Sequence, residues 1–304
     1  LSFGFFSSVR QLMNATHSAL AGVSAADKVE KLLDIDTARP CHPDLPRQNR
    51  PFDGIRLEHI SFGYQGRQAA LRDVSLGVPR GKTVALVGLS GSGKSTIASL
   101  LMRFYDLEQG RILLEGWDYT SFPPEELRKR VILVPQSVSL FSGTIAENLR
   151  MAAPNATRGD MLEALDQVRL GDWVRTQPLG LDTPVGDAGA KLSGGQRQKL
   201  GIARALLCRA EYIIFDEATS SVDMESEREI WNCIEELAQT RTLVLISHRL
   251  STIRSADVIY VLENGAIAQQ GSHGELMEEP GLYRRLVEEQ AQLERKGEEG
   301  LCHV

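Results

Sequence analysis

One short stretch of the sequence combines residue types and spacing that fit phosphate binding. Residues 88–96 read Gly-Leu-Ser-Gly-Ser-Gly-Lys-Ser-Thr, which matches the phosphate-loop pattern G-x-x-x-x-G-K-[ST]. In such a loop, backbone N–H groups converge on phosphate oxygens, Lys94 reaches the β and γ phosphates, and the Ser95 hydroxyl binds Mg²⁺. The predicted ligand contacts are Gly88, Ser90, Gly91, Gly93, Lys94, Ser95 and Thr96.

A second candidate is a pair of carboxylates at the end of an apolar run. Asp216 and Glu217 directly follow residues 212–215, which read Tyr-Ile-Ile-Phe and predict a buried strand. Beside a phosphate loop, such an aspartate is placed to hold Mg²⁺, and the next carboxylate is placed to orient a water in line with the γ phosphate. The alternative is that the pair only caps the following turn. We therefore expect a metal ligand at Asp216 and a general base at Glu217.

The elements that must position these residues alternate between strands and helices. The phosphate loop lies between a predicted strand, 83–87, and a predicted helix, 97–104, which is the context that the motif requires and which disfavours a turn without a ligand. Further strands are predicted at 55–60, 71–78, 111–114, 131–134, 212–215, 242–246, 257–262 and 266–270. Further helices are predicted from 124, from the turn at 193–195 to 207, over 225–238 and over 282–295, and 144–176 is mostly helical. The pattern predicts an α/β fold with a small antiparallel sheet and a helical insertion.

The pattern along the chain divides it into four parts. Residues 1–38 predict a helical segment, because apolar or small residues recur every three or four positions between Leu12 and Leu33. Residues 39–51 contain four prolines and predict a linker, 52–290 form the main domain, and 291–304 form a charged tail. The first residue is Leu rather than Met, so we expect a piece of a longer protein.

Composition narrows the classes of function. With 42% hydrophobic and 24% charged residues among 304, a sizeable core is expected. A net charge of -6 and a pI near 5.6 disfavour nucleic-acid binding. No apolar run approaches the ~18 residues needed to span a bilayer. The four cysteines, Cys41, Cys208, Cys233 and Cys302, form no C-x-x-C pair, which disfavours a zinc site and a disulfide framework.

A five-residue motif points to a family. Residues 192–196, Leu-Ser-Gly-Gly-Gln, match letter for letter the signature motif of the nucleotide-binding domain of ATP-binding cassette (ABC) transporters, which the chain resembles from Phe52 to Val287. The resemblance implies a P-loop NTPase core with an antiparallel β subdomain and a helical signature-motif subdomain. It also implies ATP and Mg²⁺ as cofactors and Mg²⁺-dependent, transport-coupled ATP hydrolysis as the activity.

The resemblance assigns roles to residues that mean little singly. Tyr64 corresponds to the aromatic residue that stacks on adenine, a contact of roughly 1 to 3 kcal/mol. Gln136 corresponds to the glutamine that senses Mg²⁺ and the membrane domain, and His248 to the switch histidine. The implied catalytic residues are Glu217, His248 and Gln136, the implied metal ligands are Ser95, Gln136 and Asp216, and further nucleotide contacts are Ser193, Gly194, Gly195, Gln196 and Asp223.

The same resemblance implies partners. In this family the signature motif contacts the ATP bound to a second nucleotide-binding domain, so two domains close head to tail on two nucleotides. Residues 1 to about 36 resemble the end of a last transmembrane helix and its cytoplasmic extension, and residues 141–149 resemble the segment that exporters place against their membrane domains. We therefore expect a membrane-associated domain on the cytoplasmic face, partnered by transmembrane domains of the same or another chain. All catalytic positions are intact, which favours a homodimer with two active sites.

Departures and alternatives qualify this interpretation. Residues 187–189 read Asp-Ala-Gly where exporters commonly have Glu-Arg-Gly, which puts the usual cross-domain contact in doubt, and Ser221 replaces a more usual alanine. The main alternative is a soluble ABC-type ATPase that acts as a nucleotide-gated clamp in DNA repair or translation. Lys94 and Ser193 are only 99 positions apart, which leaves no room for the long coiled coil of repair members. Intact Glu217 and His248 disfavour a regulator that only binds nucleotide.

Overall fold

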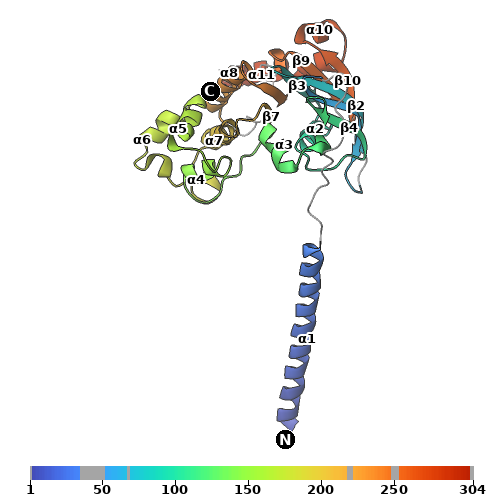
Figure 1. The fold of residues 1–304 in the computed structure, drawn as a ribbon, viewed down its shortest axis with the longest axis vertical. Coiled ribbons are helices and arrows are strands. Elements are labelled where there is room, and N and C mark those ends of the chain that lie inside the picture. The colour runs from blue at the N-terminus through green and yellow to red at the C-terminus, as the bar shows by residue number, and fades with distance from the viewer. Residues whose placement is uncertain (1, 35–51, 67–68, 218–221, 248–252, 302–304) are drawn as a thin grey trace. The chain divides into compact units, whose positions relative to one another are not determined.

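The computed structural model describes residues 2–34, 52–66, 69–217, 222–247 and 253–301 (Figure 1). The chain divides into two compact units, Leu1–Cys41 and His42–Val304. His248, Ser221 and the predicted linker 39–51 lie outside the described residues.

The described residues of the first unit form helix α1 (Ser2–Leu33), which lies within the predicted helical segment 1–38. Its apolar side chains, such as Leu12, Leu20 and Val23, are about two-thirds exposed within the unit. Among the described residues, no helix combines the length and the apolar character that crossing a membrane requires. The predicted division of the chain into four parts stays a prediction.

The second unit begins with an antiparallel sheet, as predicted. Its strands are β1 (Gly54–Gly63), β2 (Ala69–Pro79), β4 (Gln109–Leu114) and β5 (Trp117–Asp118), in the order β2-β1-β4-β5. Buried residues such as Leu57 and Leu76 alternate with half-buried or exposed ones over most of β1 and β2, which is the pattern of a sheet with one covered face.

A larger sheet forms the centre of the unit. Its strands are β3 (Thr83–Gly88), β6 (Val131–Val134), β7 (Tyr212–Asp216), β8 (Thr242–Ile246), β9 (Val258–Glu263) and β10 (Ala266–Gly271), in the order β10-β9-β3-β8-β7-β6. All pairings are parallel except the hairpin of β9 and β10. Strands β3 and β8 are buried at every position, because a central parallel strand is covered on both faces.

The helices of the unit cover these sheets and form a separate lobe. The α-helices are α2 (Lys94–Leu101), α3 (Pro124–Arg130), α4 (Ile145–Arg150), α5 (Arg158–Gln167), α6 (Gly171–Thr176), α7 (Gly194–Leu207), α8 (Met224–Ala238), α10 (His273–Glu278) and α11 (Leu282–Leu301). Short 3₁₀ turns lie at Tyr119–Ser121, Gly180–Asp182 and Asp187–Gly189. Helices α4 to α7 gather in one lobe, apart from α2 and the antiparallel sheet (Figure 1). The predicted α/β class and its helical subdomain are confirmed.

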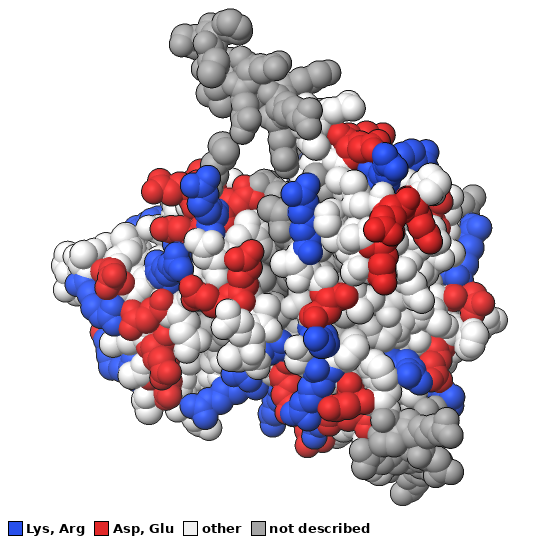
Figure 2. All heavy atoms as spheres, turned by 90° about the horizontal axis from the view of Figure 1, so that it is seen from above, with Lys and Arg blue, Asp and Glu red and all other residues white. Residues whose placement is uncertain are grey.

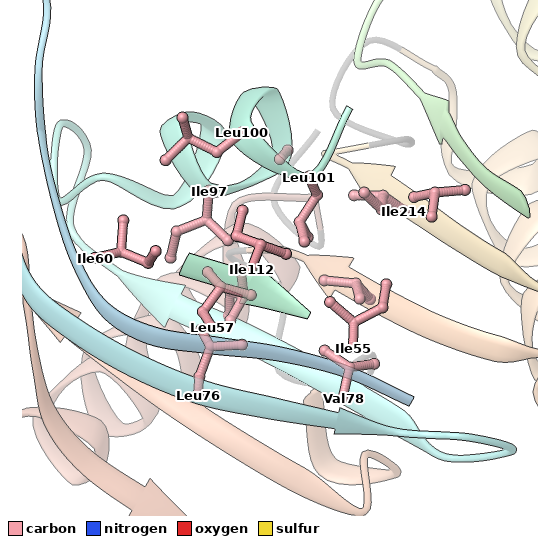
Figure 3. Close-up of a cluster of buried hydrophobic side chains, with 14 of the residues drawn as sticks. Ile55, Leu57, Ile60, Leu76, Val78, Ile97, Leu100, Leu101, Ile112 and Ile214 are labelled. Carbon is pink, nitrogen blue, oxygen red and sulfur yellow. The ribbon is translucent and has the colours of Figure 1, made fainter. Parts of the chain in front are cut away.

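Helix α2 is packed between the two sheets (Figure 3). Its Ile97 and Leu100 lie in one apolar cluster with Leu57 and Ile112 of the antiparallel sheet and with Ile214 of β7. Burying each such side chain contributes about 1.5–3 kcal/mol to folding. The phosphate loop therefore ends on a helix that is fixed from both sides.

Several boundaries differ from the sequence prediction. Helix α2 ends at Leu101 instead of Phe104, because Arg103 adopts a left-handed conformation with φ of 51° that stops the helix. Helix α11 extends to Leu301, past the predicted end at Arg295. Strand β5, with two residues, is too short to leave a periodic signal. The capping box of Ser272 and Glu275, which opens α10, is a sequence signal that was missed.

The charged side chains on one face of the molecule are of both signs. Among the described residues drawn in Figure 2, Lys and Arg are interspersed with Asp and Glu over the whole visible face. The described residues of this face therefore form no continuous surface of one charge.

Candidate functional site

The phosphate loop connects β3 to α2 through two positions that demand glycine. Gly88 and Gly93 have φ of 152° and 106°. A Cβ on Gly88 would lie 2.2 Å from the Leu262 carbonyl oxygen, and one on Gly93 would lie 2.6 Å from Leu71 Cδ2. Any side chain at either position would therefore displace backbone or core. The glycines of the motif are required here by backbone conformation and by close packing.

Lys94 is enclosed by the loop that precedes it. Its side chain is buried, and Nζ donates to the carbonyl oxygens of Gly88 and Leu89, each at 2.8 Å. Burial lowers the pKa of Lys94, and the nearby carboxylates of Glu217 and Asp216 act against that shift. An ammonium group thus lies inside the curve of the loop, within electrostatic range of both acidic residues.

Asp216 meets the phosphate loop across an intervening strand. The Ser95 hydroxyl lies 3.3 Å from Asp216 Oδ1, at hydrogen-bond distance. Strand β8 lies between β3 and β7, and its Ile246 pairs with Leu86 on one side and with Asp216 on the other. The carboxyl ends of parallel strands lie at the same edge of a sheet, so the phosphate loop after β3 and Asp216 at the end of β7 lie close together.

Glu217 follows Asp216 in a left-handed conformation. Its φ is 48°, which is uncommon for a residue other than glycine and is frequent at functional sites. Its backbone N–H donates to the Ile246 carbonyl oxygen at 2.8 Å, and its side chain is half-buried. The residue that the sequence predicts to be the general base therefore has a left-handed backbone conformation.

The oxygen atoms at this edge suit a hard divalent cation. The Ser95 hydroxyl and the Asp216 carboxylate are adjacent. Gln136, which is exposed, follows β6, the strand that pairs with β7 through Val134 and Phe215. Within the described ranges, no group of three or more His, Cys, Asp and Glu side chains is placed to hold a metal. One carboxylate with neutral oxygen donors fits Mg²⁺, which shares its coordination with phosphates and water.

Tyr64 forms a hydrogen bond to α2, the helix that begins in the phosphate loop. Its hydroxyl donates to Thr96 Oγ1 at 3.2 Å, and its ring makes edge-to-face contacts with Phe62 and Tyr105, each with 5.1 Å between centroids. The predicted base-stacking residue is thereby fixed beside the loop. Sequence reasoning missed Tyr105, because an aromatic residue just past a helix carries no pattern of its own.

The signature residues lie at the start of α7, in the helical lobe. Ser193 caps this helix: its hydroxyl accepts from the Gln196 N–H at 3.2 Å, and its own N–H donates to Gln196 Oε1 at 2.9 Å. Gly195 packs against α8, where a Cβ would lie 2.4 Å from Ser226 Cβ. Asp223 caps α8 by accepting from the Ser226 N–H at 2.9 Å. The first turns of α7 and α8 pack against each other, so the signature motif and Asp223 lie close together.

The structure thus gathers the predicted site residues into two groups. Lys94, Ser95, Asp216 and Glu217 meet at the edge of the parallel sheet. Residues 193–196 lie on α7, which packs against α5, α8 and β6, whereas α2 packs against β3 and β7 (Figure 1). The two groups are on separate parts of the unit.

The segment that departs from the exporter pattern contacts the loop after β6. The Ser142 hydroxyl donates to Asp187 Oδ1 at 2.8 Å, and the Val185 N–H donates to the Gly143 carbonyl oxygen at 2.9 Å. Ala188 has φ of 50° and an exposed side chain. Asp187 is therefore engaged within its own chain.

The sequence and the fold of the chain are similar to those of ABC transporters. The ABC transporter family model matches residues 71–220. An ATP-dependent lipid A-core flippase of Vibrio vulnificus is 44% identical over 93% of this chain and 49% of its own length. A putative multidrug export ATP-binding/permease protein of Bacillus subtilis is 40% identical over 92% of this chain and 49% of its own. A bacterial Atm1-family ABC exporter with ATP bound superposes with a TM-score of 0.80 at 38% identity, over 89% of this chain and 47% of its own.

The fold and the site define the chain as a P-loop ATPase domain that binds ATP. It is a nucleotide-binding domain of the ABC transporter type, whose family model matches residues 71–220, and it is similar to proteins named as exporters of that family. The chain spans about half the length of the curated relatives it matches.

Proposed function

We propose that the chain is the motor domain of an ABC exporter, which closes on two Mg-ATP with a second nucleotide-binding domain and drives transport through transmembrane domains. The observation that carries the proposal is the contact between Ser95 and Asp216, with Lys94 and Glu217 beside it. A phosphate-binding loop, a metal-binding carboxylate and a general base at one edge of a sheet are the parts that phosphoryl transfer to water requires.

Each residue then has a defined task. The loop N–H groups and Lys94 bind the β and γ phosphates, and Tyr64 stacks on the base. Ser95, Asp216 and Gln136 hold Mg²⁺, which neutralises charge on the phosphates when it is bound. Glu217 accepts a proton from the attacking water and orients that water toward the γ phosphate. His248, assigned by resemblance, contacts the γ phosphate.

The signature residues complete the site of a second domain. They start a helix, where N–H groups and the helix dipole favour an anion, and they lie on a different part of the unit from the phosphate loop of their own chain. A head-to-tail dimer brings each signature motif to the other domain's ATP. The export functions named for the relatives favour this role over a soluble clamp in repair or translation.

The transmembrane partners and the location follow from the same proposal. Residues 1–38 form the end of a last transmembrane helix or its cytoplasmic extension, and the segment 141–149 faces the membrane domains from the cytoplasmic side. In that segment, Phe141 is 59% exposed, which leaves its ring accessible to such a contact. The closing of the two nucleotide-binding domains is transmitted to the membrane through this surface.

Hydrolysis should depend on the protein concentration, because a single chain contains only half of each site. We expect the specific ATPase activity in Mg²⁺ to rise with concentration and to fall to background when EDTA removes the metal. The measurement is phosphate release over a dilution series, with sedimentation in parallel. A specific activity that stays constant down to concentrations where the chain is monomeric would refute the dimeric site.

Tyr64→Ala is expected to weaken ATP binding by roughly tenfold, because base–aromatic stacking contributes on the order of 1–3 kcal/mol. Tyr64→Phe keeps the ring and loses only the hydrogen bond to Thr96, so its effect should be within about threefold. Titration with a fluorescent ATP analogue measures both variants. If Tyr64→Ala bound ATP as tightly as the wild type and also kept the same preference for ATP over GTP, the stacking role would be wrong.

A further inference from the structure

One face of α7 is attached to the loop that carries Gln136. Gln198 Nε2 donates to the Pro135 carbonyl oxygen at 3.1 Å, and Arg204 Nη1 donates to the Ser139 carbonyl oxygen at 2.7 Å. Between them, Gly201 packs so closely that an added Cβ would lie 2.4 Å from Val138 Cγ2. These three α7 positions are spaced by three residues and therefore share one face of the helix. Residues 135–139 are thus held along α7.

The bond made by Gln198 acts on the peptide unit that precedes Gln136. The Pro135 carbonyl belongs to the same planar group as the N–H and Cα of Gln136. Gln198 is only 3% exposed, whereas Pro135 is exposed, so the donor side of this hydrogen bond is buried. Because the peptide group is planar, holding the Pro135 oxygen also holds the backbone N and Cα of Gln136, and these two atoms set the direction of the Gln136 side chain.

The other end of α7 begins with the signature motif. Ser193 caps the helix, and Gly195 rests on Ser226 of α8. One rigid helix therefore presents the residues that contact the second domain's ATP and, five positions after Ser193, anchors the segment whose glutamine serves the ATP of its own chain. A displacement of α7 moves both together.

We propose that Gln198 is a positioning residue that couples the two nucleotide sites of the dimer. Its hydrogen bond places Gln136 in its own Mg-ATP site when α7 docks its signature motif on the partner's nucleotide. This inference rests on the proposed function, and it adds a residue to the mechanism without giving that residue contact with the nucleotide or the metal.

Two variants test the coupling by different routes. Gln198→Met keeps the length of the side chain but removes the N–H donor. Gly201→Ala leaves Gln198 intact, favours the helix by its intrinsic propensity, and pushes the branched Val138 and its loop away. Two readouts apply: hydrogen exchange of residues 136–144 without nucleotide, and the Mg²⁺ concentration for half-maximal ATP hydrolysis. We expect Gln198→Met to raise each readout by about tenfold, the size expected from one lost hydrogen bond, and Gly201→Ala to raise both readouts by displacing the loop.

Lys199→Met is the matched control. Lys199 is the next residue of α7 and is also buried, but its Nζ donates to the Arg169 carbonyl oxygen and pairs with Glu229, away from the loop. This variant should leave both readouts unchanged even if it lowers the melting temperature. ATP binding measured without Mg²⁺ should stay within about twofold of the wild type in all three variants, because none of these side chains contacts the phosphate loop.

The outcomes separate the inference from the function on which it rests. If the wild type lacked Mg²⁺-dependent ATPase activity, the proposed function would be refuted, and the coupling with it. If the wild type were active and Gln198→Met showed unchanged exchange and an unchanged Mg²⁺ requirement, the positioning role alone would be refuted. It would also be refuted if Lys199→Met raised both readouts as much as Gln198→Met, since the effect would then come from general weakening of α7.

Discussion

Glu217→Gln is expected to lower the rate of ATP hydrolysis by about 10²- to 10⁴-fold, which is the usual contribution of a positioned general base. The amide has nearly the shape of the carboxylate but does not accept a proton from the attacking water. Glu217 lies next to Asp216 at the edge of the sheet, and its backbone is fixed by the bond to Ile246. The change should therefore leave the site intact while it removes the chemistry.

Binding and assembly should survive this substitution. ATP affinity is expected to stay within about threefold of the wild type, since the carboxylate is not a ligand of the base or of the ground-state phosphates. Because bound ATP closes the dimer and hydrolysis reopens it, the variant should accumulate as a dimer in ATP. Phosphate release, nucleotide titration and sedimentation measure the three effects. Glu235→Gln, on an exposed position of α8, is the control and should match the wild type.

Unchanged turnover in Glu217→Gln would remove Glu217 from the base role. Loss of ATP binding together with turnover would show instead that the carboxylate supports the structure of the site. A variant that remains monomeric in ATP would contradict the closed dimer, even if its turnover were lost.

Lys94→Ala is expected to weaken ATP binding by about 100-fold, because truncating one partner of a buried, hydrogen-bonded charge pair costs about 2–5 kcal/mol. Without nucleotide, the Lys94 ammonium is buried among carbonyl oxygens, and burial lowers its pKa, so the free protein gains little from keeping it charged there. The loss should therefore appear in nucleotide affinity and much less in the melting temperature of the free chain.

Equilibrium binding of ATP and thermal melting with and without ATP measure this prediction. The wild type should be stabilised by ATP in proportion to the logarithm of ligand concentration over Kd, and Lys94→Ala should lose most of that stabilisation. Lys129→Ala, at an exposed position of α3, controls for the loss of a positive charge. A Lys94→Ala chain that bound ATP normally would contradict the assignment of the phosphate loop.

Periodicity and turn residues were sufficient to predict most of the fold. The strand before the phosphate loop, the helix after the signature motif and the strands predicted at 257–262 and 266–270 are present, because each has a local signal of apolar spacing or turn chemistry. The end of α2 was wrong, since it depends on the left-handed conformation of Arg103, which is stabilised by packing that no local pattern records.

The site could be predicted as a set of residues and not as an arrangement. The motifs named Lys94, Ser95 and Asp216, but the contact between the last two arises only because β8 is inserted between β3 and β7. The bond from Gln198 to Pro135 joins positions 63 residues apart and has no sequence signature. The roles of the site residues, and that of His248 outside the described residues, remain predictions.

The central claim is that each ATP site is built from two chains, and mixing two inactive variants tests it most directly. Lys94→Ala disables the phosphate loop, and Ser193→Arg disables the signature motif, so each variant alone should be inactive. A mixed dimer contains one intact site, formed by the phosphate loop of the Ser193→Arg chain and the signature of the Lys94→Ala chain. Half of the dimers in an equal mixture are mixed if pairing is random, and each holds one of two sites, so the mixture should recover activity up to about a quarter of the wild-type rate. A mixture that stays inactive under conditions where the wild-type chain hydrolyses ATP would contradict the composite site.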